Sequence, residues 1–96
     1  MKVVAINGSP RRGGNTHDML EAALSPLVEA GHDCEIIQIG GKDVRGCTGC
    51  AKCRETKDNA CHGRNDYLNE IMPRVYAADI IILGSPTYFA DVTSEM

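Results

Sequence analysis

The sequence lacks any long apolar run. No segment approaches the roughly 20 apolar residues that a helix needs to span a membrane. The first apolar run, at residues 3–6, is far too short for the apolar core of a signal peptide. These absences predict a protein with no membrane partner, and we expect it to be cytoplasmic.

An excess of positive charge is also lacking. Ten Lys and Arg residues stand against thirteen Asp and Glu, a net charge of −3, which disfavours a nucleic-acid partner. The charge is uneven, because residues 42–64 hold six basic and three acidic side chains and are net +3, leaving −6 for the remainder. Positive charge therefore gathers in one segment, which also holds most of the cysteines.

Three short β-branched runs predict strands at residues 2–6, 34–39 and 79–84. The first run shows no alternation, as is typical of a strand buried on both faces of a parallel sheet, and the third is also expected to be buried. Gly40 and Gly41 close the second run.

Helical spacing of apolar residues predicts a first helix that is capped by Asn15 or Thr16 and ended by Gly31. A second is expected over residues 65–78, capped by Asn65 or Asp66, and the start of a third at residues 92–96. Pro26 and Pro73 lie inside these patterns, where proline kinks a helix or shifts its register.

Alternating strands and helices predict an α/β fold with helices on both faces of a parallel sheet. Ninety-six residues make one small domain. Three strands are few for such a sheet, so we expect residues 1–96 to be the N-terminal part of a single domain, or a half-fold that a partner chain completes.

The glycine-rich loop after the first strand, "NGSPRRGGNT", predicts a phosphate site at a helix N-terminus. It lacks Gly-x-Gly-x-x-Gly, and Gly14 and Asn15 stand where a P-loop needs Lys and Ser or Thr. A cradle for one terminal phosphate remains, with an ordinary strand-to-helix turn as the alternative. Its expected donors are the Ser9, Asn15 and Thr16 side chains, Arg11 or Arg12, and the N–H groups of Gly13 and Gly14.

Four of the five cysteines lie in "CTGCAKCRETKDNAC", inside the irregular segment 42–64. That segment is too long for a passive connection, so it should be functional. In a cytoplasmic chain the cysteines point to metal or redox chemistry rather than to disulfides.

The spacing of these cysteines favours an iron–sulfur cluster over zinc or free thiols. Cys47, Cys50 and Cys53 form two successive Cys-x2-Cys steps, as in ferredoxin-type [4Fe–4S] sites, and Cys61 follows after seven residues. The positive segment would offset the charge of an anionic cluster. We expect His62 to be a surface residue and Cys34 to be a buried strand residue.

The loop after the third strand, "GSPTYFADV", holds the only adjacent aromatic pair of a chain that is 4% aromatic. Ligands bind at the carboxyl ends of parallel strands, so a flavin ring beside Tyr88 and Phe89 is expected. The alternative is that the pair covers the edge of the core.

Together the two loops and "CTGCAKC" resemble the flavodoxin-like NAD(P)H-dependent FMN reductase family, in particular its iron–sulfur flavoprotein branch. The resemblance implies a doubly wound parallel sheet of order 2-1-3-4-5, of which this chain supplies about the first three strands. It also implies homodimers or homotetramers. By this resemblance Ser9, Arg11, Asn15 and Thr16 would hold the FMN phosphate, Pro86, Thr87, Tyr88 and Phe89 would lie along the isoalloxazine, and Cys47, Cys50, Cys53 and Cys61 would ligate the cluster.

The sequence thus predicts a flavin-dependent oxidoreductase that passes electrons between a [4Fe–4S] cluster and FMN, with a small-molecule or protein electron donor or acceptor. It needs no general base, in keeping with the lack of a convincing His–Asp or paired-carboxylate constellation. A cluster-free NAD(P)H-dependent FMN or quinone reductase, and a zinc-bound non-catalytic interaction module, are the alternatives.

Overall fold

The computed structural model of the chain describes residues 1–64 and 66–96. Its three strands, β1 (Lys2–Asn7), β2 (Asp33–Gln38) and β3 (Ile80–Gly84), form one sheet in the order β2-β1-β3. Both pairings are parallel, and Val3 of β1 lies opposite Cys34 and Ile80. The flavodoxin-like α/β fold expected from the sequence is confirmed over these three strands.

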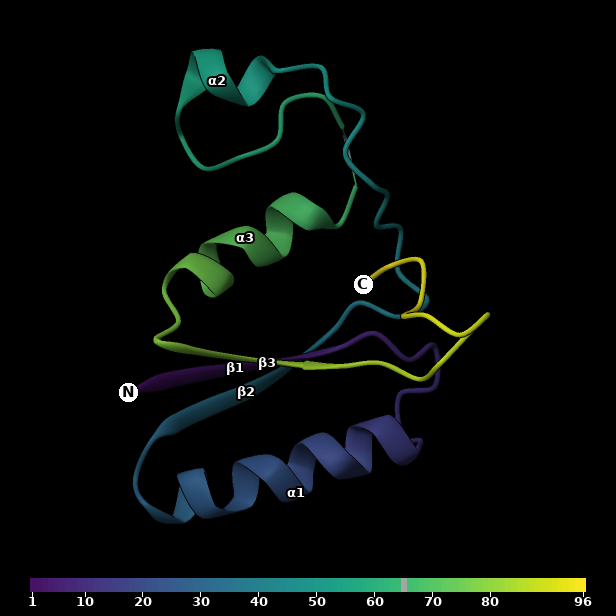
Figure 1. Cartoon of the computed structure of the whole chain (residues 1–96). Coiled ribbons are helices and arrows are strands. Elements are labelled where there is room, and N and C mark those ends of the chain that lie inside the picture. Colours follow the sequence, from purple (N-terminus) through teal and green to yellow (C-terminus); the bar gives the residue numbers. More distant parts are fainter. Residues whose placement is uncertain (65) are drawn as a thin grey trace.

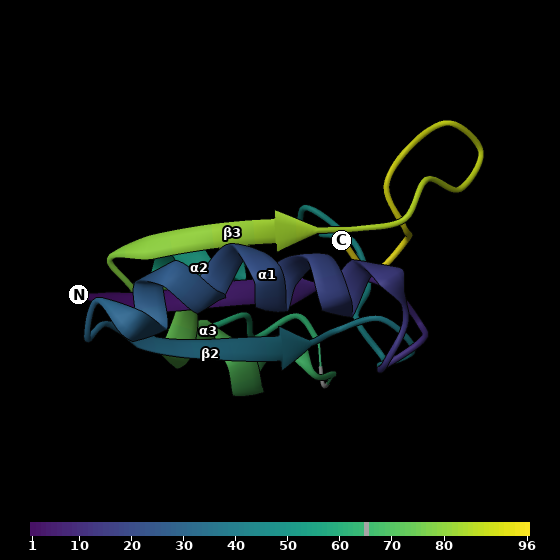
Figure 2. The same cartoon turned by 90° about the horizontal axis from the view of Figure 1, so that it is seen from below.

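Helices cover both faces of the sheet. In Figure 1 the sheet is seen edge-on, with α1 (Asn15–Glu29) on one side and α3 (Leu68–Tyr76) on the other. Figure 2, seen from below, shows that α1 runs over the sheet in roughly the direction of the strands. A short helix, α2 (Lys52–Thr56), lies farther out beyond α3. None of the helices in the described residues is both long and apolar enough to cross a membrane.

The alternation of side chains along β1 divides the core into two clusters. Val3 and Ala5 pack with Leu20 and Leu24 of α1. Val4 and Ile6 pack on the opposite face with Ile71 of α3. Each helix is therefore held by an apolar contact with the central strand, which is why β1 is almost completely buried.

The start of α1 differs from the sequence prediction, because its N-cap is Gly14 rather than Asn15 or Thr16. The predicted end is confirmed. Gly31 has φ +90°, and the bonds from Gly31 N–H to Val28 O (3.0 Å) and from His32 N–H to Leu27 O (3.1 Å) form a Schellman motif. The helix continues past Pro26 without ending there.

The second predicted helix is shorter than the span 65–78, since α3 runs from Leu68 to Tyr76 and includes Pro73. The predicted cap Asn65 lies outside the described residues. The alternative cap, Asp66, precedes the N-cap position Tyr67, yet its Oδ1 accepts the Leu68 N–H (3.0 Å).

The helix predicted at residues 92–96 is wrong. This segment forms only a turn, in which the Met96 N–H donates to Thr93 O (3.2 Å). The Thr93 N–H instead bonds to Ser85 Oγ (3.0 Å), and its hydroxyl donates to Gly8 O (2.8 Å). These bonds hold Thr93 against the loop after β3, which contains Ser85, and the loop after β1, which contains Gly8.

The expectation that the third strand is buried is also wrong. Ile81 and Leu83 are 46% and 63% exposed. Their side chains lie on the sheet face opposite that of Ile82, which packs on the α1 cluster, and the core cluster on the α3 side includes no residue of β3.

Candidate functional site

The loop after β1 is fixed by a buried amide network. Asn7 is fully buried; its Oδ1 accepts the Ser9 N–H (2.9 Å) and its Nδ2 donates to Gln38 Oε1 (3.0 Å). The Gln38 Nε2 then donates to Ser9 O (2.6 Å) and Gly40 O (2.8 Å). The first loop is therefore tied to the end of β2 before any ligand binds.

The first backbone N–H groups of α1 are hydrogen-bond donors that the helix itself does not use. Ser9 Oγ accepts the Arg11 N–H (3.2 Å), and the first intrahelical bond of α1 runs from Asp18 N–H to Gly14 O (3.1 Å). The N–H groups of residues 15–17 thus precede the helical ladder, as at every helix start. Together with Gly13 and Gly14, these groups lie at a helix N-terminus, the kind of position that favours anions.

The first and last loops lie side by side, as the sequence predicts for the carboxyl ends of neighbouring strands. The Gly8 N–H donates to Gly84 O (2.8 Å), and the Thr93 hydroxyl donates to Gly8 O (2.8 Å). Both Ser9 and Thr93 are buried at this junction. A ligand that spans the two loops would therefore meet a preformed junction.

The tip of the last loop is a tight turn that extends away from the sheet, as Figure 2 shows. Tyr88 and Asp91 exchange two backbone hydrogen bonds (2.9 and 3.0 Å), and Phe89 and Ala90 between them have φ of 50° and 62°. The Phe89 side chain is fully exposed and Tyr88 is 45% exposed. The turn therefore does not bring Phe89 against the loop after β1.

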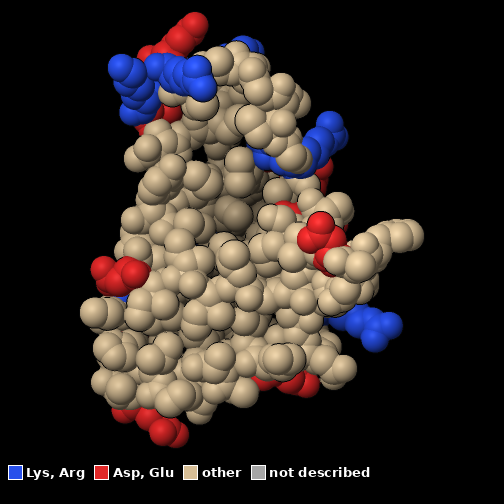
Figure 3. All heavy atoms as spheres, viewed as in Figure 1, with Lys and Arg blue, Asp and Glu red and all other residues tan. Residues whose placement is uncertain are grey.

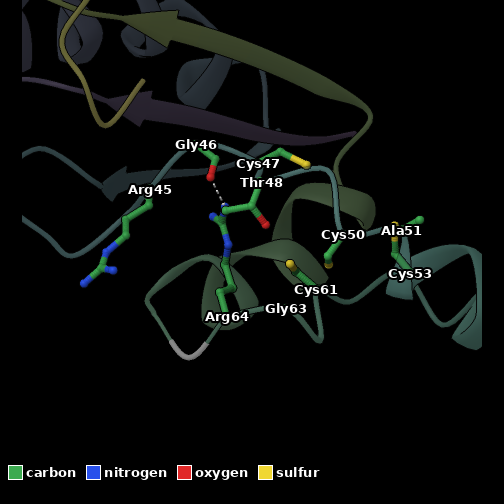
Figure 4. A pocket seen from close by; sticks show the side chains of 10 residues that line it. All are labelled: Arg45, Gly46, Cys47, Thr48, Cys50, Ala51, Cys53, Cys61, Gly63 and Arg64. Atoms are coloured by element: carbon green, nitrogen blue, oxygen red, sulfur yellow. Dashed lines mark hydrogen bonds between the residues drawn. The ribbon is translucent and has the colours of Figure 1, made fainter.

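The four clustered cysteines line one recess, together with Arg45, Gly46, Thr48, Ala51, Gly63 and Arg64. Its volume is about 120 Å³. Figure 4 shows that the side chains come from three segments: the extended chain of residues 45–50, α2 and the turn before α3. All four are free thiols; Cys61 is half-buried and the other three are exposed.

Two residues with left-handed backbone conformation set the path of the chain between the first three cysteines. Gly49 has φ 75° and its N–H donates to Cys47 Sγ (3.3 Å), while Ala51 has φ 64° and begins α2. Cys50 lies between these two residues, and Cys53 is on the helix itself. On the other wall, a Cβ added to Gly63 would lie 2.6 Å from Cys50 Sγ, so only glycine leaves room for this thiol.

His62 is hydrogen-bonded to Asp58 and is not among the residues that line the recess. Its Nε2 lies 2.8 Å from Asp58 Oδ2, and both side chains are about half exposed. The hydrogen bond from His62 holds the pKa of Asp58 below its ordinary value, against a smaller opposing effect of desolvation. The expectation of a surface histidine agrees with this position.

Basic side chains outnumber acidic ones in the segment that forms the recess, with six against three over residues 42–64. Figure 3 shows Lys and Arg side chains, with Asp and Glu side chains among them, over the α2 end of the molecule, above a hollow in its face. Lys52, Arg54 and Lys57 are all exposed there. A second cavity of about 400 Å³ connects this surface to α3, where Leu68, Met72 and Tyr76 form its apolar wall.

Among the described residues, one group of three possible metal ligands has its atoms within 4.8 Å of one another, namely His17, Asp18 and Glu21 on α1. Both carboxylates are well exposed. We assign it no function. Cys34, in contrast, is half-buried beside the α1 core cluster, close to its predicted place.

The sequence reasoning missed Asn7, Gln38 and Thr93, which hold the loops together. A signal was present for the first two, because polar residues that end adjacent parallel strands fall opposite each other, as Asn7 and Gln38 do. Thr93 had no such signal, since its role depends on a loop path. Arg64 and Asn69, which contact the cysteine segment, were missed for the same reason.

A three-stranded parallel sheet with helices on both faces, a glycine-rich loop after β1 and a cysteine recess between β2 and α3 together define a flavodoxin-like α/β domain. The model of the family described as NADPH-dependent FMN reductase matches residues 1–96. The chain belongs to this family, which confirms the resemblance seen in the sequence.

Curated relatives of the chain are named iron–sulfur flavoproteins. One from Methanocaldococcus jannaschii is 40% identical over all 96 residues, and one from Archaeoglobus fulgidus is 41% identical over the same length. A third, from Methanosarcina thermophila, is 32% identical. The chain spans 48%, 42% and 49% of these proteins, about half of their length. No solved structure matches the chain.

Proposed function

We propose that the protein is a flavin-dependent oxidoreductase that binds FMN and a [4Fe–4S] cluster and passes electrons between them. The observation that carries this proposal is the combination of a full-length match to an FMN reductase family with four free cysteines around one recess of the same chain. The names of the curated relatives support the same reading.

The first loop fits the phosphate of FMN. The helix start offers N–H groups that precede the α1 ladder, and Ser9 is held in place by the Asn7 network. We assign phosphate binding to Ser9, Arg11, Asn15 and Thr16 with the backbone of Gly13 and Gly14, and contact with the flavin ring to Pro86, Thr87, Tyr88 and Phe89.

The cysteine recess fits a cluster better than a single zinc ion. A tetrahedral zinc site with Zn–S bonds of about 2.3 Å needs sulfurs roughly 3.8 Å apart. In the described part of the chain, no three cysteine sulfurs lie within 4.8 Å of one another. The four thiols line one recess of about 120 Å³, which supports a larger group held by Cys47, Cys50, Cys53 and Cys61.

When bound, the flavin would supply hydride and one-electron chemistry and the cluster one-electron chemistry. The residues of this chain would bind the two groups, orient them and shield them from solvent. The helix start of α1 neutralises the phosphate, the recess holds the thiolates, and basic side chains such as Arg64 lower the energy of an anionic group there.

We further propose a homodimer or homotetramer in the cytoplasm, with a small-molecule or protein electron donor or acceptor, and NAD(P)H as a possible reductant. The free thiols support a reducing compartment, and the printed name of the family supports the nucleotide. A reductase that binds FMN but no cluster remains the alternative.

One anaerobic purification tests the proposal, with a visible spectrum and assays for iron, acid-labile sulfide and FMN. The expected result is about four iron and four sulfide per chain together with flavin. Flavin without iron would leave the simpler reductase. Stoichiometric zinc without flavin would contradict the proposal.

Two pairs of variants locate the sites. Cys53→Ser should abolish the iron signal, whereas Cys34→Ser, outside the recess, should leave it unchanged. Arg11→Ala combined with Asn15→Ala should weaken FMN binding by tenfold or more, on the order of 1.4 kcal/mol. The exposed Arg45→Ala is its control, and equal FMN affinity in both would contradict the phosphate site.

A further inference from the structure

We propose that Arg64 and Asn69 are positioning residues that hold the two arms of the cysteine segment on α3 before any metal binds. The first arm is residues 45–50, with Cys47 and Cys50, and the second is residues 57–64, with Cys61. The inference rests on the proposed cluster function, since it concerns how this chain prepares its thiols for that group.

Asn69 fixes the fourth cysteine through two hydrogen bonds to its backbone. The Cys61 N–H donates to Asn69 Oδ1 (2.8 Å), and Asn69 Nδ2 donates to Cys61 O (2.7 Å). Both polar backbone groups of Cys61 are thus satisfied by one side chain. Asn69 lies on α3 two residues before Ile71, which is 4% exposed in the core. Cys61 is therefore tied to the sheet through a single rigid helix.

Arg64 fixes the first arm to the same helix. Its Nη2 donates to Gly46 O (2.7 Å), directly before Cys47, and its Nη1 lies 3.3 Å from Asp66 Oδ2. The two side chains are only 11% and 3% exposed. Asp66 also accepts the N–H groups of Arg45 (3.2 Å) and Leu68 (3.0 Å), so one carboxylate joins the first arm to the start of α3.

Apolar packing contributes little to holding the cysteines of these arms and of α2. α2, which carries Cys53, has no buried residue, and none of the four cysteines belongs to either core cluster of the described residues. Fixing each residue of a loose loop costs about 1–2 kcal/mol of backbone entropy. Hydrogen bonds that order the arms in advance remove part of this cost from the binding of the cluster, which is the benefit of a preorganised site.

Two variants with matched controls test the inference. Asn69→Leu removes both bonds to Cys61 at similar volume, and Glu70→Leu changes the adjacent exposed position of α3. Arg64→Met removes the bond to Gly46, and Arg54→Met removes the same charge from exposed α2. Arg64→Lys keeps the positive charge and a donor group, so its loss of protection and of iron should be smaller than that of Arg64→Met.

The first readout uses iron-free protein under anaerobic conditions, with amide hydrogen exchange followed by NMR. We expect exchange at Cys61 to rise roughly tenfold or more in Asn69→Leu, because the protecting bonds are lost. Exchange at Arg45, whose N–H donates to Asp66 Oδ2 (3.2 Å), should rise in Arg64→Met, because Asp66 loses the ion pair that holds it. The controls should exchange like the unchanged protein, and the amides of β1 should stay protected in every variant that folds.

The second readout is reconstitution with Fe²⁺ and sulfide, followed by iron retention and the EPR spectrum of the reduced protein. We expect each positioning variant to lose iron about tenfold faster than its control and to give an altered EPR signal. Equal exchange and equal retention in variant and control would overturn the inference. If the unchanged protein takes no iron, the proposed function fails, and the exchange contrast alone then decides whether the two residues order the arms.

Discussion

Gly8 lies in the first loop, where Thr93 and Met96 approach it closely. A Cβ at this position would lie 2.9 Å from Thr93 Oγ1 and 3.0 Å from Met96 Cε. Because Thr93 is buried and hydrogen-bonded to Gly8 O, it cannot move aside freely. We predict that Gly8→Ala lowers the free energy of unfolding by about 1–3 kcal/mol, the usual cost of overpacking, as measured by urea denaturation.

Gly13→Ala is the control for this prediction. No heavy atom lies within 4 Å of a Cβ added there, and Gly13 is not among the glycines with positive φ. Its unfolding free energy should stay the same or rise by about 0.4–1 kcal/mol, since alanine restricts the unfolded chain. Equal destabilisation by the two substitutions would show that the junction is not tightly packed.

Gly63 makes a similar close approach, but to a mobile side chain. A methyl group there would meet Cys50 Sγ, which is exposed and can rotate away. We predict that Gly63→Ala changes the free energy of unfolding by less than about 0.5 kcal/mol yet turns Cys50 out of the recess and lowers iron retention severalfold. Gly46→Ala, with open space around its Cβ, should retain iron normally. Equal iron retention in the two variants would contradict this prediction.

At the scale of elements, Pro26 is the residue of α1 that fits its helix least well. Proline has no N–H to donate to Ala22 O and its ring crowds that carbonyl, although both residues are exposed and water can reach them. We predict that Pro26→Ala raises the free energy of unfolding by about 1–3 kcal/mol, because the helix gains a bond and loses the clash.

The measurement is thermal and urea unfolding followed by circular dichroism at 222 nm. Ser25→Ala, also exposed on α1, serves as the control and should change stability by only about 0.5 kcal/mol. A destabilised Pro26→Ala would mean that the rigidity of proline in the unfolded chain outweighs its cost in the helix.

The elements that the sequence predicted well are those fixed by local patterns. The three strands and α1 follow from apolar runs and helical spacing, and the Gly31 end follows from its positive φ. The helix expected at residues 92–96 failed because Thr93 bonds to Gly8, far away in the chain. α2 was missed because it buries nothing and thus shows no apolar period.

The candidate site was predictable to the same degree. The four cysteines were found from their spacing, and the structure places them around one recess. The residues that support them were not found, since Arg64 and Asn69 act through backbone groups of other segments. Such bonds leave no periodic trace in the sequence, because any polar residue that reaches the right carbonyl can make them.

At the scale of the whole molecule, the sheet and the cysteine segment are separate in their packing. The two core clusters join β1 to α1 on one face and to α3 on the other, without Cys47, Cys50, Cys53 or Cys61. Figure 1 shows α2 standing beyond α3, away from the sheet. The apolar contacts that stabilise the fold therefore do not depend on anything bound to the cysteines.

This separation predicts the result of removing the metal site. With Cys47, Cys50, Cys53 and Cys61 all changed to Ser, the free energy of unfolding of the metal-free protein should change by less than about 1 kcal/mol, because surface substitutions away from the core are nearly neutral. Chelation of the wild type should likewise leave its far-ultraviolet circular dichroism intact, while amide exchange increases in α2, which has no buried residue and lies between the two arms. The buried Leu20→Ala, by contrast, should cost about 2–5 kcal/mol. A zinc-dependent module would behave in the opposite way and lose its sheet with its metal, so unfolding on chelation would contradict both the separation and the redox proposal.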